Sequence, residues 1–249
     1  MTGPLIEICV EGIDGLLAAQ AAGADRVELC ASLLEGGITP SLGTVRTALK
    51  LATVPFHAMV RPRGGDFLYS QAEFDTMLAD VEALRDLGVA GVVFGCLTAD
   101  GTIDEARMSA LVRAAGPVNV TCHRAFDMAR DPTEALEALI RCGVGRVLTS
   151  GQRDTAAEGA TLLAALVRQA GNRIVILGCG GLDAGNIAGI RSRTGLTELH
   201  FAALKDVASG MLYRNPNVGM GGTDLDREYR NTLTDSEAVR MTIAAARAG

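Results

Sequence analysis

One short pattern recurs along the chain and constrains its fold more than any other feature. It consists of a helix end, a glycine and a buried strand, and it appears as "AAGADRVEL", "DLGVAGVVF", "AAGPVNVT" and "RCGVGRVLT". Glycine suits the left-handed backbone that closes a helix. Strands that follow helices at regular intervals are typical of βαβ units with right-handed crossovers. The repeat therefore predicts a parallel α/β protein.

Eight apolar or β-branched runs alternate with eight Ala- and Leu-rich runs of helical period. The expected strands are 5–9, 25–30, 56–60, 91–95, 119–123, 146–149, 173–178 and 198–201. The expected helices are 13–22, 44–52, 71–87, 104–115, 132–142, 155–170, 184–192 and 235–247. Eight such units within residues 1–249 predict a single-domain (β/α)8 TIM barrel. A doubly wound sheet is the rival fold, but no G-x-G-x-x-G follows the first strand.

Two further features concern the ends of these elements. The segment 202–233 is expected to be a long loop between the last strand and the last helix, and loops of this length are usually functional or form an assembly surface. Ser70 to Glu73 and Thr234 to Glu237 match capping boxes, and Asp131 precedes a proline at a helix start.

Charge and hydropathy narrow the function classes. The net charge of -6 argues against a general binder of the nucleic-acid backbone, which needs a basic face. No apolar run approaches the length of a membrane span. The N-terminus lacks the basic region of a signal peptide, so we expect a cytoplasmic protein whose six cysteines are reduced thiols.

Residue types suited to catalysis gather at the carboxyl ends of the expected strands, where TIM barrels carry their chemistry. The candidates are Glu7, Glu28, Arg61, Arg63, His123, Arg124 and Asp127, and His200 ends the eighth strand. Carboxylates and histidine can exchange protons near neutral pH, and paired arginines suit a carboxylate or phosphate ligand. Alternatively, Arg61 and Arg63 neutralise Glu7 and Glu28 in a structural network, since such networks resemble active sites.

Small residues at the same strand ends could bind an anion through their backbone N–H groups. The candidates are Gly64, Gly65, Ser150, Gly151, Gly178, Gly180 and Gly181. The alternative is that these glycines only relieve steric crowding in tight turns.

The first two strands carry the related runs "IEIC" and "VELC". Alternation along a strand places Glu7 and Cys9 on one face and Glu28 and Cys30 on one face. At matching heights on neighbouring strands, Cys9 and Cys30 could bracket a soft ion such as Cu(I). The alternative is a pair of buried structural thiols. The roles of Cys96, Cys122 and Cys179 stay open.

Seven blocks together resemble the CutC family of copper homeostasis proteins. In order they are "IEIC", "RVELCA", "EGGITPSLG", "RPRGGDF", "HRAFD", "RVLTSGQ" and "YRN", from residue 6 to about residue 215. The resemblance implies a cytoplasmic barrel that assembles as a homo-oligomer, a dimer or tetramer, and is linked to Cu(I) binding. It also brings Cys9 and Cys30 forward as the copper ligands.

Three functional hypotheses follow. The first is a Cu(I)-binding homeostasis protein in which the barrel is a scaffold for Cys9 and Cys30. The second is a barrel lyase or isomerase acting on a small phosphorylated or carboxylated metabolite at the rim. The third is an interaction protein that docks through 202–233. The expected partners are thus a copper ion or a small anionic ligand, with no nucleic acid and no membrane.

Overall fold

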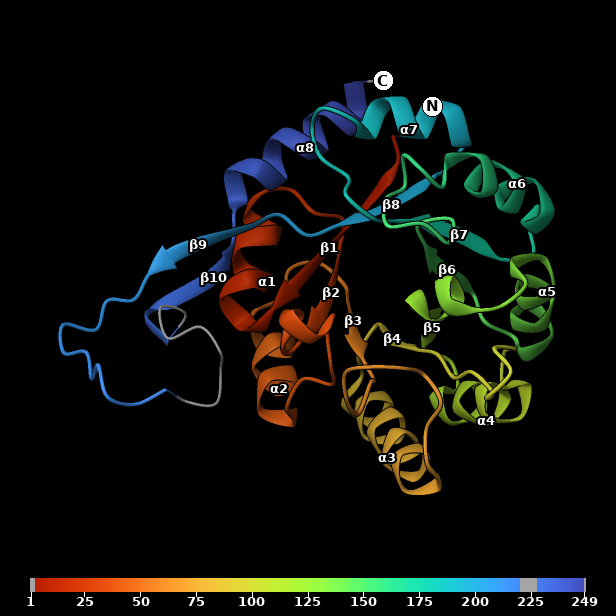
Figure 1. Ribbon diagram of the computed structural model, residues 1–249, viewed down its shortest axis with the longest axis horizontal. Coiled ribbons are helices and arrows are strands. Elements are labelled where there is room, and N and C mark those ends of the chain that lie inside the picture. The colour runs from red at the N-terminus through yellow and green to blue at the C-terminus, as the bar shows by residue number, and fades with distance from the viewer. Residues whose placement is uncertain (1–2, 220–227, 249) are drawn as a thin grey trace.

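Eight parallel strands close into a barrel in the order of the chain, with helices around the outside (Figure 1). The computed structural model describes residues 3–219 and 228–248. The barrel strands are β1 Leu5–Glu11, β2 Arg26–Cys30, β3 Phe56–Met59, β4 Gly91–Phe94, β5 Asn119–Cys122, β6 Arg146–Thr149, β7 Val175–Gly178 and β8 Glu198–Phe201. The predicted (β/α)8 TIM barrel is confirmed.

The outer ring consists of helices that follow the strands in turn. They are α1 Gly12–Ala21, α2 Leu42–Leu51, α3 Gln71–Leu87, α4 Glu105–Ala115, α5 Pro132–Cys142, α6 Ala160–Ala170, α7 Ile187–Thr194 and α8 Ser236–Ala248. Two short 3-10 helices, η1 Leu33–Glu35 and η2 Arg124–Met128, lie after β2 and β5. The expected helix at 155–170 begins five residues late because Thr155 and Glu158 cap each other in a separate turn.

Helix caps follow the local sequence at most of the predicted starts. Ser70 and Glu73 form the predicted capping box of α3, and Asp131 caps α5 ahead of its proline. At α8 the prediction was wrong by one residue: Asp235, not Thr234, accepts from the first-turn N–H groups. Thr234 instead pairs in a strand.

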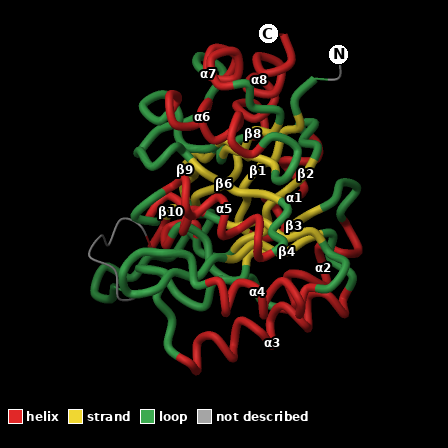
Figure 2. The backbone as a smooth tube through the Cα atoms, turned by 90° about the vertical axis from the view of Figure 1, so that its right-hand side faces the viewer, coloured by secondary structure: helices red, strands yellow, loops and turns green. Residues whose placement is uncertain are grey.

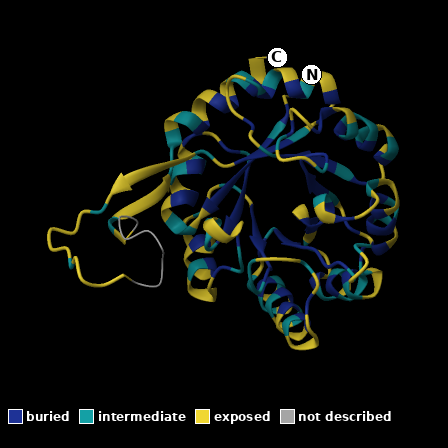
Figure 3. Cartoon of the chain, viewed as in Figure 1, coloured by how far each residue is buried: buried dark blue, intermediate teal, exposed yellow. Residues whose placement is uncertain are grey.

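Burial separates the barrel from its helices. The strands are almost entirely buried, while the helices alternate buried faces toward the barrel with exposed faces toward solvent (Figure 3). The apolar side chains between strands and helices form one continuous core. None of the helices in the described ranges combines the length and apolar character that a bilayer crossing requires.

The segment 202–233 departs from the prediction of a loop. Its described arms are the strands β9 Leu204–Ala208 and β10 Arg230–Thr234, which pair antiparallel and project beside α1, away from the barrel (Figures 1 and 2). The arms are far apart in sequence, so no short turn signalled them. Residues 220–227 lie outside the described part. Leu212 and Tyr213 in this segment are strongly exposed, as an assembly surface requires. Assembly through this segment stays a prediction.

Candidate thiol and acid–base site inside the barrel

A closed ionic network lies toward the amino ends of the strands. Arg26 at the start of β2 donates to Glu7 and, over 2.7 Å, to Glu198. Arg146 at the start of β6 donates two hydrogen bonds to Glu198, of 2.7 and 3.1 Å. We call Glu7, Arg26, Arg146 and Glu198 the lower network. Each of its charges meets an opposite charge, as burial of an ion requires.

His200 of β8 links this network to the residues above it. Its Nδ1 lies 2.7 Å from Glu7 Oε1, and its Nε2 lies 3.9 Å from Glu28 Oε2. Burial alone would lower the pKa of His200, but Glu28, Cys9 and Glu7 together raise it well above its usual value. Burial alone would raise the pKa of Glu7, but His200 and Arg26 hold it far below its usual range. The pair is therefore an imidazolium and a carboxylate at neutral pH.

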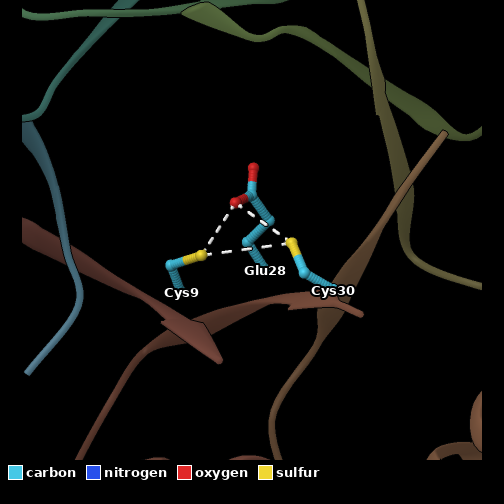
Figure 4. Close-up of side chains that lie close together, drawn as sticks. All are labelled: Cys9, Glu28 and Cys30. Carbon is cyan, nitrogen blue, oxygen red and sulfur yellow. Dashed lines mark hydrogen bonds between the residues drawn. The ribbon is translucent and has the colours of Figure 1, made fainter. Parts of the chain in front are cut away.

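Above this pair lie two thiols that share one carboxylate, the group we call the thiol site (Figure 4). Cys9 Sγ donates to Glu28 Oε2 over 3.2 Å, and Cys30 Sγ lies 3.6 Å from the same oxygen. The two sulfurs are 4.0 Å apart. The other oxygen of Glu28 is buried without a hydrogen-bond partner. Such an atom is costly to bury, which makes it a place where a proton or ion would be stabilising.

The strand register corrects one part of the sequence argument. Cys9 is level with Glu28 on β2, and Cys30 is level with Glu11 on β1. The thiols are thus not at matching heights, and they meet across a diagonal. Glu28 lies between them on the inner face for that reason.

Both thiols are protonated in this environment. The hydrogen bond with Cys30, together with burial, raises the pKa of Cys9 well above its usual value. The hydrogen bond with Cys9 would lower the pKa of Cys30, but burial and the nearby Glu28 raise it to about 11. Burial also raises the pKa of Glu28. Any metal must therefore displace protons before it can bind thiolates.

Two sets of side chains could hold a metal ion within the described part of the chain. One is Cys9, Glu28 and Cys30, and the other is Glu7, Glu28 and His200; in each, the potential ligand atoms lie within 4.8 Å of one another. The first set contains soft donors and the second contains harder oxygen and imidazole donors. The second set is already consumed by the ion pair of Glu7 with His200, so the first is the better metal site.

The structure gives Arg61 and Arg63 other partners than the sequence predicted. Arg61 donates to the backbone carbonyls of Glu35, Gly37 and Gly65. Arg63 pairs with Asp66 and Glu73 at the surface. The proposed neutralisation of Glu7 and Glu28 by these arginines was wrong, because Arg26 and His200 supply the positive charges.

The turn after these arginines also differs from an anion cradle. The carbonyl of Gly64 accepts from Arg63 over 3.0 Å, and the carbonyl of Gly65 accepts from Arg61 over 2.8 Å. The arginines thus organise the turn by binding its oxygens. This explains two guanidinium groups beside two glycines without any ligand.

His123 is buried but is not placed as the acid–base group. Its Nδ1 accepts from the backbone N–H of Ala125 over 3.2 Å and so caps η2, and its ring packs 4.9 Å from that of Phe67. Burial and the charge of Arg61 lower the pKa of His123 to about 3. The imidazole between two carboxylates is that of His200, which the sequence analysis placed at the rim without a role.

Asp127 of η2, after β5, acts as an internal anion for the loop after β6. It accepts from the N–H groups of Ser150 and Gln152, both over 3.1 Å, and pairs with Arg124 over 2.8 Å. The N–H of Gly151 donates to the hydroxyl of Thr149 over 2.9 Å. These donors already bind groups of the protein, so the structure lends no support to anion binding by Ser150 and Gly151, which stays a prediction.

A cavity of about 290 Å³ opens above the thiol site at the carboxyl ends of the strands. Cys9 and His200 line it from the barrel, and Arg124, Gly180 and Gly181 line it from the loops. Cys179 lines it as well, whereas Cys96 and Cys122 are buried elsewhere in the core. We call it the mouth cavity.

Comparison with known proteins agrees with the family that the seven sequence blocks indicate. The model of the CutC family matches residues 4–205. The chain belongs to the CutC family. A CutC family protein of Mesorhizobium japonicum is 80% identical over 245 residues, which cover 98% of this chain and 95% of that protein.

Solved structures place this CutC chain among TIM barrels. The CutC protein of Streptococcus agalactiae, assigned provisionally to copper homeostasis, is 33% identical, with a TM-score of 0.76 over 80% of this chain and 98% of that chain. A phosphoribosylanthranilate isomerase of Thermotoga maritima is 14% identical, with a TM-score of 0.55 over 98% of each chain. The second likeness shows the fold alone.

Proposed function

We propose that this CutC chain is a cytoplasmic copper homeostasis protein that binds one Cu(I) ion between the thiolates of Cys9 and Cys30. The observation that carries the proposal is the 4.0 Å separation of the two sulfurs around one carboxylate. The provisional assignment of the related Streptococcus agalactiae CutC protein to copper homeostasis supports copper as the metal.

The sulfur separation suits a shared ion. Metal–thiolate bonds are roughly 2.3 Å long in zinc sites, so two thiolates on one ion lie roughly 3.8 to 4.6 Å apart. Thiolates are soft ligands that favour Cu(I) over hard cations such as Mg²⁺ or Ca²⁺. Val93 and Met59 pack beside the thiols and offer no oxygen ligand on that side, which favours a soft ion.

Binding of Cu(I) as a bis-thiolate group releases two protons, of which Glu28 takes up one and the solvent the other. The Cys9 thiol already points its proton at Glu28, whose other oxygen has no partner. Burial raises the pKa of Glu28 and thus favours its neutral form. A bis-thiolate Cu(I) group carries one negative charge, and the adjacent His200 imidazolium compensates it. Binding then leaves the buried site close to neutral.

Competition for Cu(I) against a chromophoric chelator under anaerobic conditions tests the proposal. The double variant Cys9→Ser and Cys30→Ser should lose at least about a hundredfold in affinity, since both soft ligands are gone. Cys142→Ser is the matched control, because that buried thiol lies on α5 outside the barrel. Equal affinity of the double variant and the wild type would refute copper binding at this site.

A barrel lyase or isomerase is the second candidate, and one observation favours it. His200 lies between Glu7 and Glu28, an arrangement suited to moving a proton to and from a substrate. A thermal-shift screen of small phosphorylated and carboxylated compounds, repeated with His200→Gln, tests it. The absence of any stabilising compound would count against an enzyme.

A further inference from the structure

We infer that the mouth cavity binds a tetrahedral oxyanion, either inorganic phosphate or the phosphate group of a small monoester, through Arg124 and the N–H groups of Gly180 and Gly181. The inference does not rest on copper binding. It assigns the anion to Arg124 and not to Arg61 or Arg63, because only Arg124 of the three lines the mouth cavity.

The first argument is the charge of the lining. Arg124 and His200 contribute two cationic groups, and none of the described residues that line the cavity carries a carboxylate. The protein as a whole is acidic, with a net charge of -6. Asp127 and Glu7 pair with these two cations from behind the lining, so the surface that a ligand meets presents cationic groups and no carboxylate, which favours an anion over a cation.

The second argument is the backbone at Gly180 and Gly181. Both residues have positive φ angles, of 99° and 64°. The carbonyl of Gly180 accepts from the N–H of Ala156 over 2.8 Å, and the carbonyl of Gly181 accepts from Asn186 over 2.7 Å. Their own N–H groups find no acceptor among the described residues. Consecutive N–H groups of this kind form the concave sites that bind phosphate.

Glycine is required at position 180 for a steric reason. A Cβ atom there would lie 2.9 Å from the Cβ of Ser150, closer than side chains pack. The loop after β7 therefore packs directly on the loop after β6, whose Ser150 hydroxyl donates to Asp127 of η2, the partner of Arg124. Two loops far apart in sequence are thus held together at the cavity wall.

The third argument is the orientation of the Arg124 guanidinium, which internal hydrogen bonds fix on one side. Asp127 binds its Nε over 2.8 Å, and Ser150 accepts from Nη2 over 2.8 Å. Within the described chain, Nη1 has no acceptor. The side chain is 47% exposed, so water or a ligand can reach it. A guanidinium fixed on one side by an internal carboxylate is preorganised to bind an external anion on the other.

The mouth cavity is larger than a free phosphate ion requires. At about 290 Å³ it has room for a phosphate group and a short carbon chain. With the phosphate on Arg124 and the glycines, that chain would lie over Cys9 and His200, which form the floor. The site therefore suits a small phosphate monoester.

Isothermal titration of the metal-free protein tests the inference. The ligands are inorganic phosphate and glycerol 3-phosphate, with chloride at equal ionic strength as the negative control. We expect both phosphates to bind and the Kd to rise about tenfold to a hundredfold in Arg124→Ala, since a charge-assisted contact is lost. Arg141→Ala is the matched control, because Arg141 forms an exposed ion pair with Glu105 on the outer helices. Tighter binding of the monoester would identify it as the ligand class, and equal binding would identify free phosphate.

A second readout uses the wild-type protein alone and does not depend on a folded variant. At alkaline pH, and after baseline alkylation of Cys9 and Cys179 by a neutral maleimide has been measured, phosphate should slow that alkylation, because both thiols line the cavity, and leave the rate at Cys142 unchanged. No protection of Cys9 and Cys179 at any phosphate concentration would overturn the inference. So would a loss of phosphate binding in Arg63→Ala with none in Arg124→Ala.

Discussion

The lower network and the thiol site lie one above the other inside the same barrel, yet they are built on opposite principles. In the lower network, Arg26 and Arg146 meet Glu7 and Glu198 with every charge compensated. In the thiol site, Glu28 faces two neutral thiols, has the His200 imidazolium only at 3.9 Å, and keeps one oxygen without a hydrogen-bond partner. The first arrangement fixes a structure, and the second leaves a group ready to take up a proton or an ion.

From this difference we expect the lower network to stabilise the fold and the thiol site to carry the function. Removal of a charge from the lower network exposes its partner as an uncompensated buried ion. Removal of the charge of Glu28 takes away an ion that burial disfavours. The predictions below test that contrast in order of expected effect.

Arg26→Met should have the largest effect on stability. The substitution leaves Glu7 and Glu198 without their shared cation, and loss of one partner of a buried ion pair costs about 3–5 kcal/mol of unfolding free energy. Urea denaturation measures it. Arg141→Ala, which removes an exposed pair, is the control and should leave the midpoint unchanged. Equal urea midpoints for both variants would contradict a stabilising role of the lower network.

His200 should make stability depend on pH in a defined window. Its pKa is raised in the folded protein, so its contribution is complete below about pH 6.5 and is lost as the pH rises through the folded-state pKa. Between pH 6.5 and 8 we therefore expect the unfolding free energy to fall, by at most about 1.4 kcal/mol per pH unit. Denaturation at several pH values measures the slope, and His200→Gln should flatten it. A slope that survives this substitution would assign the effect to another group.

Glu28→Gln should leave stability unchanged or raise it by about 1 kcal/mol, since a buried charge disappears while the amide oxygen can still accept from Cys9. Glu7→Gln is the matched control within the barrel and should destabilise, because the charge of Glu7 is paired. Urea denaturation of both variants gives the comparison. A larger loss in Glu28→Gln than in Glu7→Gln would reverse the roles of the two layers.

The smallest effect is expected at His123, whose imidazole should not change its protonation state between pH 5 and 8. Burial and Arg61 lower its pKa to about 3, so its imidazole stays neutral between pH 5 and 8. Proton NMR of the imidazole resonances follows this directly, with His200, whose pKa is raised, as the contrasting ring. A midpoint for His123 inside that pH range would restore it as an acid–base candidate.

Much of the fold was predictable because it depends on local patterns. The alternation of apolar runs with Ala- and Leu-rich runs predicted all eight barrel strands to within a few residues, and the helix–glycine–strand repeat marked four of them. The arms of 202–233 escaped prediction because β9 and β10 pair over a long separation without a turn signal. Alternation along β1 and β2 also predicted that Glu7 and Cys9 share one face and that Glu28 and Cys30 share one face; the contacts of Glu28 with both thiols agree with this.

The partners of the charged residues were not predictable in the same way. Alternation tells which face a side chain occupies, but it does not tell its height, because the strands of a barrel are staggered. Arg26 was not considered, although it begins the strand that carries Glu28, and Arg61 and Arg63 were assigned to carboxylates that they do not contact. A basic residue at the amino end of a strand was the available signal for the lower network.

The amino-acid sequence by itself determined the eightfold repeat, the order of the strands and the inward face that carries two acids and two thiols. The tertiary structure alone decided which of these groups meet. Closure of the barrel brings β8 beside β1, so His200 contacts Glu7 across 193 positions of the chain. The stagger of β1 against β2 then places Glu28, and not a second thiol, level with Cys9. Contacts of this kind depend on the geometry of the closed sheet, which no local pattern contains.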